Sequence, residues 1–127
     1  MTRSEALVRS VLGPCRRGIR PFVFAVELVI EHSFAIDYPI EDLQVTKVIY
    51  PEVARLLKMK RESVGRQIER IANDCWDRGD RARLNEILGT ELPFCPPPRE
   101  MLFYFAAYAY YGLPFHEVMK QQLAAIF

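Results

Sequence analysis

The sequence predicts an all-α fold, a single-domain helical bundle of about seven or eight helices that contains a helix-turn-helix. Apolar residues recur at helical spacing along most of the chain, and capping residues, glycines and prolines divide it into segments of helical length. No segment shows the strict alternation that predicts a confident strand. Because 127 residues, 50% of them hydrophobic, suffice for one core, we expect one domain over residues 1–127.

Two helices are expected near the start of the chain. The first covers Ser4–Leu12, with Ser4 as its N-cap and Gly13-Pro14 as its stop. The second begins at Pro21, which suits the first turn of a helix because an N–H at that position would have no partner within the helix. A basic loop, Cys15–Arg20, joins the two helices.

Three helices are expected in the middle of the chain. One covers residues 41–59 and bends or restarts at Tyr50-Pro51, because proline lacks an N–H and crowds the preceding turn. Its apolar side would consist of Leu43, Val48, Ile49, Val53, Leu56 and Leu57. The next helix ends near Arg78-Gly79, and its buried stripe is predicted at Val64, Ile68, Ile71 and Cys75. Asp80 then caps a short helix that ends at Gly89.

Two further helices are expected in the C-terminal region, residues 97–127, and the first is rich in aromatic residues. These are Phe103, Tyr104, Phe105, Tyr108, Tyr110 and Tyr111, and they lie on more than one side of the helix. A helix that is apolar all round is buried or covered by a partner. The last helix would cover one side through Phe115, Val118, Met119, Leu123 and Ile126. The remaining tyrosines suit either a homodimer interface within Met101–Phe127 or packing within one chain.

Charge is unevenly distributed although the net charge is only +1. Residues 1–20 carry five basic and one acidic side chain, and residues 55–83 carry nine basic and five acidic side chains. The segment between them, residues 21–54, carries one basic and six acidic side chains. Two basic segments in an otherwise balanced chain indicate a polyanionic partner, with solvated surfaces as the alternative.

Residues 51–59 and 61–78 have the outline of a helix-turn-helix, in which the second helix enters the major groove of DNA. The side of this helix opposite the buried stripe carries arginines, which can donate two hydrogen bonds to guanine O6 and N7. We expect base contacts from Ser63, Arg66, Gln67 and Arg70. We expect phosphate contacts from Arg16, Arg17, Arg20, Lys58, Lys60 and Arg61, with a solvated loop as the alternative for the first three.

Three stretches, TKVIYPEVARLL, VGRQIER and WDRG, resemble the effector domain of the sporulation-initiation response regulator, the stage zero sporulation protein A family. The resemblance is best over residues 12–89, without gaps from about Val45, and loose from Pro97 onward. It implies a bacterial, all-helical DNA-binding domain that contacts its operator through the second helix of the motif. In the family this domain follows a phosphorylatable receiver. No receiver pattern appears in these 127 residues, so we expect an effector domain without a receiver.

The chain departs from the family at several positions of the presumed recognition helix. Arg66 is kept, and Arg70 stands where the family has a histidine. Ser63 replaces an arginine, Gly65 a glutamate and Glu69 another arginine, so the family's operator sequence is not carried over to this chain. Gly65 either permits close approach to a nucleic-acid backbone or is a drifted surface position.

Catalytic, metal and membrane functions find little support in the sequence. The cluster Asp37, Glu41 and Asp42 lies in a loop and at a helix start, where acids favour the helix dipole, so no enzyme is expected. His32 and His116 have no partner at ligand spacing, so we expect no metal, cofactor or small-molecule substrate. No apolar run reaches the roughly 20 residues that span a membrane. Three widely spaced cysteines favour a reducing compartment, so we expect a cytoplasmic protein.

Two functions therefore remain. The first is a sequence-specific DNA-binding transcriptional regulator that has double-stranded DNA as its partner. The alternative is a protein-interaction module that kept the fold but lost DNA binding, and that uses its aromatic C-terminal helices. The two differ in salt dependence, because only DNA binding should weaken steeply as salt rises.

Overall fold

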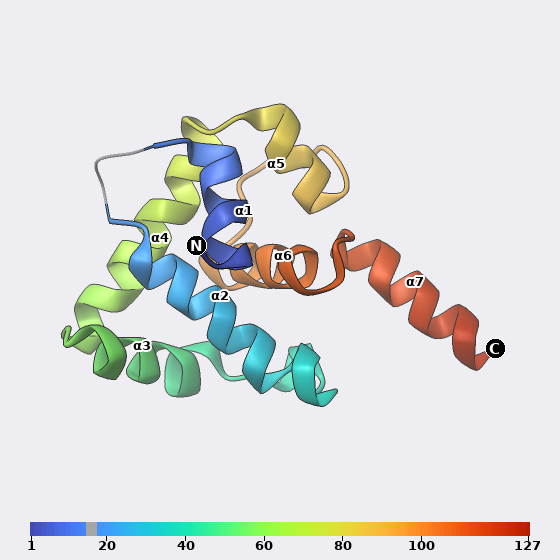
Figure 1. Cartoon of the computed structure of the whole chain (residues 1–127), viewed down its shortest axis with the longest axis horizontal. Helices are drawn as coiled ribbons and strands as arrows, with labels where there is room; N and C mark the ends of the chain where they lie inside the picture. Colours follow the sequence, from blue (N-terminus) through green and yellow to red (C-terminus); the bar gives the residue numbers. More distant parts are fainter. Residues whose placement is uncertain (15–17) are drawn as a thin grey trace.

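The all-α fold is confirmed. The computed structural model describes residues 1–14 and 18–127, and within them it contains seven α-helices and no strand (Figure 1). The helices are α1 (Arg3–Leu12), α2 (Arg20–His32), α3 (Tyr50–Leu57), α4 (Arg61–Asp77), α5 (Arg81–Leu88), α6 (Pro98–Tyr111) and α7 (Phe115–Ile126). Three short segments separate α2 from α3, namely the 3-10 turns Phe34–Ile36 and Ile40–Asp42 and the π-helical turn Val45–Ile49.

Capping side chains set the start of α1, one residue earlier than the sequence suggested. Thr2, and not Ser4, is the N-cap, and its hydroxyl Oγ1 accepts a hydrogen bond from the Glu5 N–H at 3.1 Å. Ser4 lies inside the first turn and is buried. The prediction of Ser4 as the cap was wrong because both residues are good caps, and only their position relative to the core decides between them. The stop at Gly13 is confirmed.

The predicted start of α2 and both predicted ends of α5 are also confirmed. Pro21 lies in the first turn of α2. Asp80 caps α5 by accepting a hydrogen bond from the Arg83 N–H at 3.1 Å, and Gly89 ends that helix with a φ of 81°. These helix ends depend on local chemistry, so the sequence alone was sufficient to place them.

The single helix expected over residues 41–59 is not formed. A π-helical turn ends at Ile49, where the Tyr50 N–H donates to the Val45 carbonyl, and the α-helix begins only at Tyr50. The predicted restart at Tyr50-Pro51 is therefore confirmed, because Pro51 cannot extend the hydrogen-bond pattern and its ring needs room in the preceding turn. The wider turn changes the helical phase, and Val48 and Leu56, both expected on the apolar side, are 39% and 44% exposed.

The core is built around α6, which packs against α1, α2, α4, α5 and α7. Met101, Leu102, Phe105 and Ala106 of α6 are fully buried. The rings of Phe22 and Phe105 meet edge to face, with their centroids 5.2 Å apart. Neighbouring helices of the same chain therefore bury much of the aromatic helix.

The last helix, α7, extends away from the rest of the molecule (Figure 1). Its base is anchored by Val118, which is 4% exposed, and by the half-buried Phe115. The prediction that α7 covers α6 along its length was wrong, because Met119, Leu123 and Ile126 are 41%, 51% and 74% exposed. An amphipathic pattern identifies the side of a helix that is suited to contact, but it does not say which surface makes that contact.

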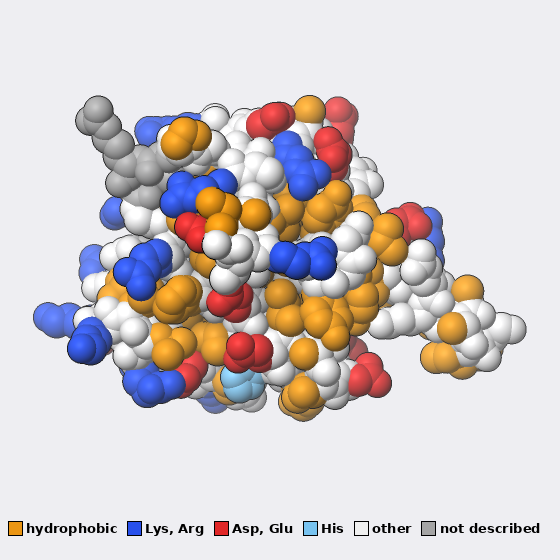
Figure 2. All heavy atoms as spheres, in the orientation of Figure 1, with side chains coloured by type: hydrophobic (Ala, Val, Ile, Leu, Met, Phe, Trp, Pro, Cys, Tyr) orange, Lys and Arg blue, Asp and Glu red, His pale blue; other side chains and the backbone are white. Residues whose placement is uncertain are grey.

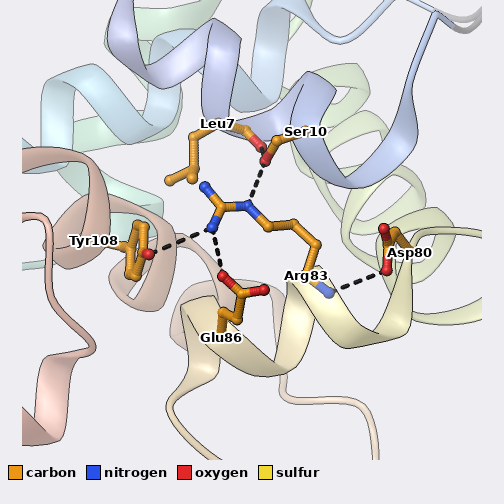
Figure 3. A network of polar contacts seen from close by, with 6 residues as sticks. All are labelled: Leu7, Ser10, Asp80, Arg83, Glu86 and Tyr108. Carbon is orange, nitrogen blue, oxygen red and sulfur yellow. Dashed lines mark hydrogen bonds and ion pairs between the residues drawn. The ribbon is translucent and has the colours of Figure 1, made fainter.

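Polar contacts join α5 to α1 and α6 around the side chain of Arg83 (Figure 3). Its Nε donates to the Ser10 hydroxyl at 3.0 Å, and its Nη1 lies 2.9 Å from a Glu86 carboxylate oxygen and 3.4 Å from the Tyr108 hydroxyl. The guanidinium also lies over the Tyr108 ring, 5.2 Å from its centroid. Arg83 thus stabilises contacts between helices of the same chain, although it belongs to the basic segment of residues 55–83 from which DNA contacts were expected.

Candidate nucleic-acid interface

The connection between α3 and α4 is a tight turn of three residues, Lys58 to Lys60. Lys58 adopts a left-handed conformation with φ 54° and ψ 49°, and the Met59 N–H donates to the Ala54 carbonyl at 2.9 Å. Lys60 is extended and its carbonyl accepts the first hydrogen bonds of α4. This geometry ends α3 and starts α4 within one turn, which is the arrangement that the sequence predicted for a helix-turn-helix.

The predicted buried stripe of α4 is confirmed. Val64, Ile68, Ile71 and Cys75 are each at most 2% exposed, and α4 packs against α2 and α3. A buried stripe fixes the rotation of the helix about its own axis, so the opposite side must face outward. The orientation of the candidate base-reading side chains therefore follows from the core.

Arg66 and Arg70 lie on the outward side of α4 and are exposed. Neither makes a hydrogen bond or an ion pair with any residue that the structure describes. By contrast, Arg81 lies over the Trp76 ring, 4.0 Å from its centroid, and donates to the Trp76 carbonyl. The guanidinium groups of Arg66 and Arg70 are therefore available to a ligand, whereas those of Arg81 and Arg83 take part in internal contacts.

The other two residues expected at the bases are less exposed. Ser63 and Gln67 are half-buried. Ser63 precedes Arg66 by three residues, so both lie on the same side of the helix, but Gln67 is turned about 100° from Arg66. The structure thus groups Ser63, Arg66 and Arg70, and it leaves Gln67 at the edge of this surface.

Further basic side chains are exposed near the start of α4 and on α2. Lys58, Lys60 and Arg61 are exposed on the turn and at the start of α4. Figure 2 shows Lys and Arg side chains along the edge of the molecule where α3 and α4 lie. Arg20 is exposed in the first turn of α2, which packs against α4. Arg16 and Arg17 lie outside the described residues, so their phosphate contacts stay a prediction.

One contact in the motif was missed from the sequence, that between Tyr50 of α3 and Gly65 of α4. A Cβ atom added at Gly65 would lie 3.4 Å from Cε2 of the Tyr50 ring. Burial, and secondarily the charge of Glu69, raises the pKa of the Tyr50 hydroxyl. Gly65 therefore faces α3 on the flank of α4, where a Cβ atom would make an ordinary van der Waals contact with the tyrosine ring. A contact between residues on different helices leaves no periodic signal in the sequence.

The described part of the chain offers neither a metal site nor a membrane-spanning helix. No group of three or more His, Cys, Asp or Glu residues there could hold a metal ion. None of the described helices has the length and apolar character needed to cross a membrane.

Comparison with known proteins supports the interpretation of the motif. The model of the family described as "Sporulation initiation factor Spo0A C terminal" matches residues 16–95, which include the whole of α2 to α5. This is a family of DNA-binding regulatory effector domains, not of enzymes. No curated protein and no solved structure matches the chain.

Proposed function

The chain belongs to the family of Spo0A C-terminal effector domains, and on this premise we propose that it is a sequence-specific DNA-binding transcriptional regulator. The observation that carries the proposal is the outward side of α4, where Arg66 and Arg70 are exposed and make no internal contact with a described residue. Arginines on the second helix of a helix-turn-helix are suited to guanine edges in the major groove. Binding to the chromosome would place the protein in the cytoplasm.

The proposal assigns different tasks to the two groups of basic residues. Arg66 and Arg70, with Ser63 and Gln67 beside them, would contact base edges and supply specificity. Lys58, Lys60 and Arg61, together with Arg16, Arg17 and Arg20, would neutralise phosphates and fix the position of the helix in the groove. In this proposal Arg16, Arg17 and Arg20 would add phosphate contacts to those made at the turn between α3 and α4.

Selection of duplexes from a random library, followed by titration at several salt concentrations, tests this function. We expect one sequence to be enriched, and we expect its affinity to fall steeply as salt rises, because phosphate binding releases counterions. Enrichment of no sequence, together with salt-independent binding or none at all, would contradict the proposal.

We further propose that the regulator is a homodimer and that the interface lies within Met101–Phe127. The support is the apolar side of α7, where Met119, Leu123 and Ile126 are exposed, and Phe127, which follows the helix, is 99% exposed. Figure 2 shows hydrophobic side chains on the part of the molecule that protrudes where α7 lies. Exposed apolar side chains that follow one side of a helix suit a partner surface. A dimer would bind two half-sites spaced by a whole number of helical turns of DNA.

The same observation favours a second candidate function, a protein-interaction module that does not bind DNA. In that case a different protein would cover the apolar side of α7. Its binding would depend on apolar contact, so it would change little between low and moderate salt. The salt titration described above separates the two functions.

A further inference from the structure

Glu69 is an acidic residue on the exposed side of α4 whose charge adds to the effect of burial in raising the pKa of the Tyr50 hydroxyl, but which has no ion-pair partner among the described residues. Its side chain is exposed and makes no hydrogen bond or ion pair with a residue in the described part of the chain. Glu62, an exposed acid at the start of α4, lies in the first turn, where the helix dipole favours a negative charge. Glu69 lies eight residues from either end of α4, too far for this effect.

The position of Glu69 places it among the candidate base-reading residues. It follows Arg66 by three residues and directly precedes Arg70, and all three are exposed. The rise of an α-helix separates Arg66 and Glu69 by about 4.5 Å along the axis, a distance close to the roughly 3.4 Å between neighbouring base pairs. The ring of Tyr50 occupies the flank of α4 beside Gly65, one turn before Glu69.

A carboxylate at this place in the major groove needs a hydrogen-bond donor. Near phosphates it is repelled, and without a donor its desolvation is costly. Among the groups on the major-groove edges of the bases, the donors are the N4 amino group of cytosine and the N6 amino group of adenine. Glutamate pairs characteristically with cytosine N4, since it has acceptors only, whereas adenine also presents the N7 acceptor.

We propose that Glu69 is a specificity-determining residue that accepts a hydrogen bond from the N4 amino group of a cytosine, in a base pair next to the guanine contacted by Arg66. This inference rests on the proposed function. Because Arg66 and Glu69 belong to one helix, the operator would contain a cytosine at a fixed offset from a guanine. It also explains why an acid is compatible with an otherwise basic surface.

Selection from a random duplex library with the wild-type protein and with Glu69→Gln tests the proposal. Wild type should enrich cytosine at one position, and Glu69→Gln should enrich adenine there, because a glutamine amide pairs with adenine N6 and N7. The variant should bind the wild-type operator about 5- to 150-fold more weakly. Glu62→Gln removes the same charge from the same helix, and it should enrich the wild-type sequence.

Three results would contradict the proposal in distinguishable ways. If Glu69→Gln enriches the wild-type sequence and binds every duplex more tightly, then Glu69 is only a solvated acid. If Glu62→Gln shifts the enriched base and Glu69→Gln does not, the reading residue is Glu62. If wild type enriches no sequence at all, the proposed function fails and this inference fails with it. Both variants should fold, because both side chains are exposed. Glu69→Gln should keep the wild-type melting temperature, and Glu62→Gln should lower it only by the small contribution of a charge in the first turn of the helix.

Discussion

At Gly79, the end of α4 comes into direct contact with α1. The Asp80 N–H donates to the Val11 carbonyl at 2.8 Å, and a Cβ atom on Gly79 would lie 2.5 Å from both the Cys75 carbonyl oxygen and Cγ1 of Val11. This approach of two helices explains the glycine that ends the WDRG stretch. Only glycine leaves room for the hydrogen bond that ties the turn between α4 and α5 to α1.

Gly79→Ala should therefore destabilise the protein. We expect the free energy of unfolding to fall by about 1–3 kcal/mol, because backbone atoms cannot move aside as a flexible side chain would. Gly65→Ala is the matched control, since a Cβ atom there makes an ordinary contact with the Tyr50 ring at 3.4 Å. Alanine is the better helix former, so this control should be neutral or stabilising by up to about 1 kcal/mol. Urea unfolding of both variants measures the difference, and equal losses would contradict it.

At the scale of the residue, the sequence predicted which side chains of α4 face outward, but it did not predict that Gly65 lies beside the Tyr50 ring. Helical spacing alone predicted that Arg66 and Arg70 face away from the core, because the stripe of Val64 and Ile68 fixes the rotation of the helix. The role of Gly65 could not be predicted, because it depends on a ring contributed by α3. Periodicity describes one helix at a time, so contacts between helices need the structure.

Among the helices, the capping residues of α5 were predicted correctly, whereas the N-cap of α1 and the helical phase before Tyr50 were not. Asp80 and Gly89 act at the ends of α5 as their chemistry predicts. The π-helical turn before Tyr50 was missed, because Pro51 indicates that a helix is disturbed but not how the backbone adjusts. One extra residue in a turn then moved Val48 out of the expected apolar side.

The contacts of Arg83 give an element-scale prediction, because this side chain joins α5 to α1 and α6 (Figure 3). Arg83→Met keeps much of the apolar stem and removes the hydrogen bonds, and we expect a loss of about 1–3 kcal/mol in the free energy of unfolding. Arg55→Met is the control, since the Arg55 side chain is 67% exposed and, among the described residues, pairs only with Glu52 of its own helix. Such a surface pair contributes about 0–1 kcal/mol. Similar melting temperatures for the two variants would contradict the role of Arg83.

For the whole molecule, the sequence predicted a single helical bundle but not the position of α7. The amphipathic pattern of α7 predicts that this helix packs along α6, whereas the helix extends outward beyond Val118 (Figure 1). Met119, Leu123 and Ile126, three of the five apolar residues that suggested packing within the chain, are instead exposed. Packing of α7 against a second copy, as we propose, would bury them.

Leu123→Glu tests the proposed dimer. Leu123 is 51% exposed within one chain, so the charge should leave the fold intact and should disrupt only an interface that covers it. Light scattering at high micromolar concentration should give a dimer mass for wild type and a monomer mass for the variant. Lys120→Glu, at a position whose side chain is 75% exposed, is the control and should keep the wild-type mass. A monomeric wild type would contradict the proposal.

The central claim is that Arg66 reads a base, and one titration tests it most directly. Wild type, Arg66→Ala and Lys60→Ala are titrated against the selected operator and a scrambled duplex at several salt concentrations. Arg66→Ala should cost about 1–3 kcal/mol on the operator and little on the scrambled duplex. Lys60→Ala should weaken both duplexes alike and reduce the salt slope by about one unit. If Arg66→Ala binds both duplexes as wild type does, Arg66 contacts only water and the central claim is contradicted.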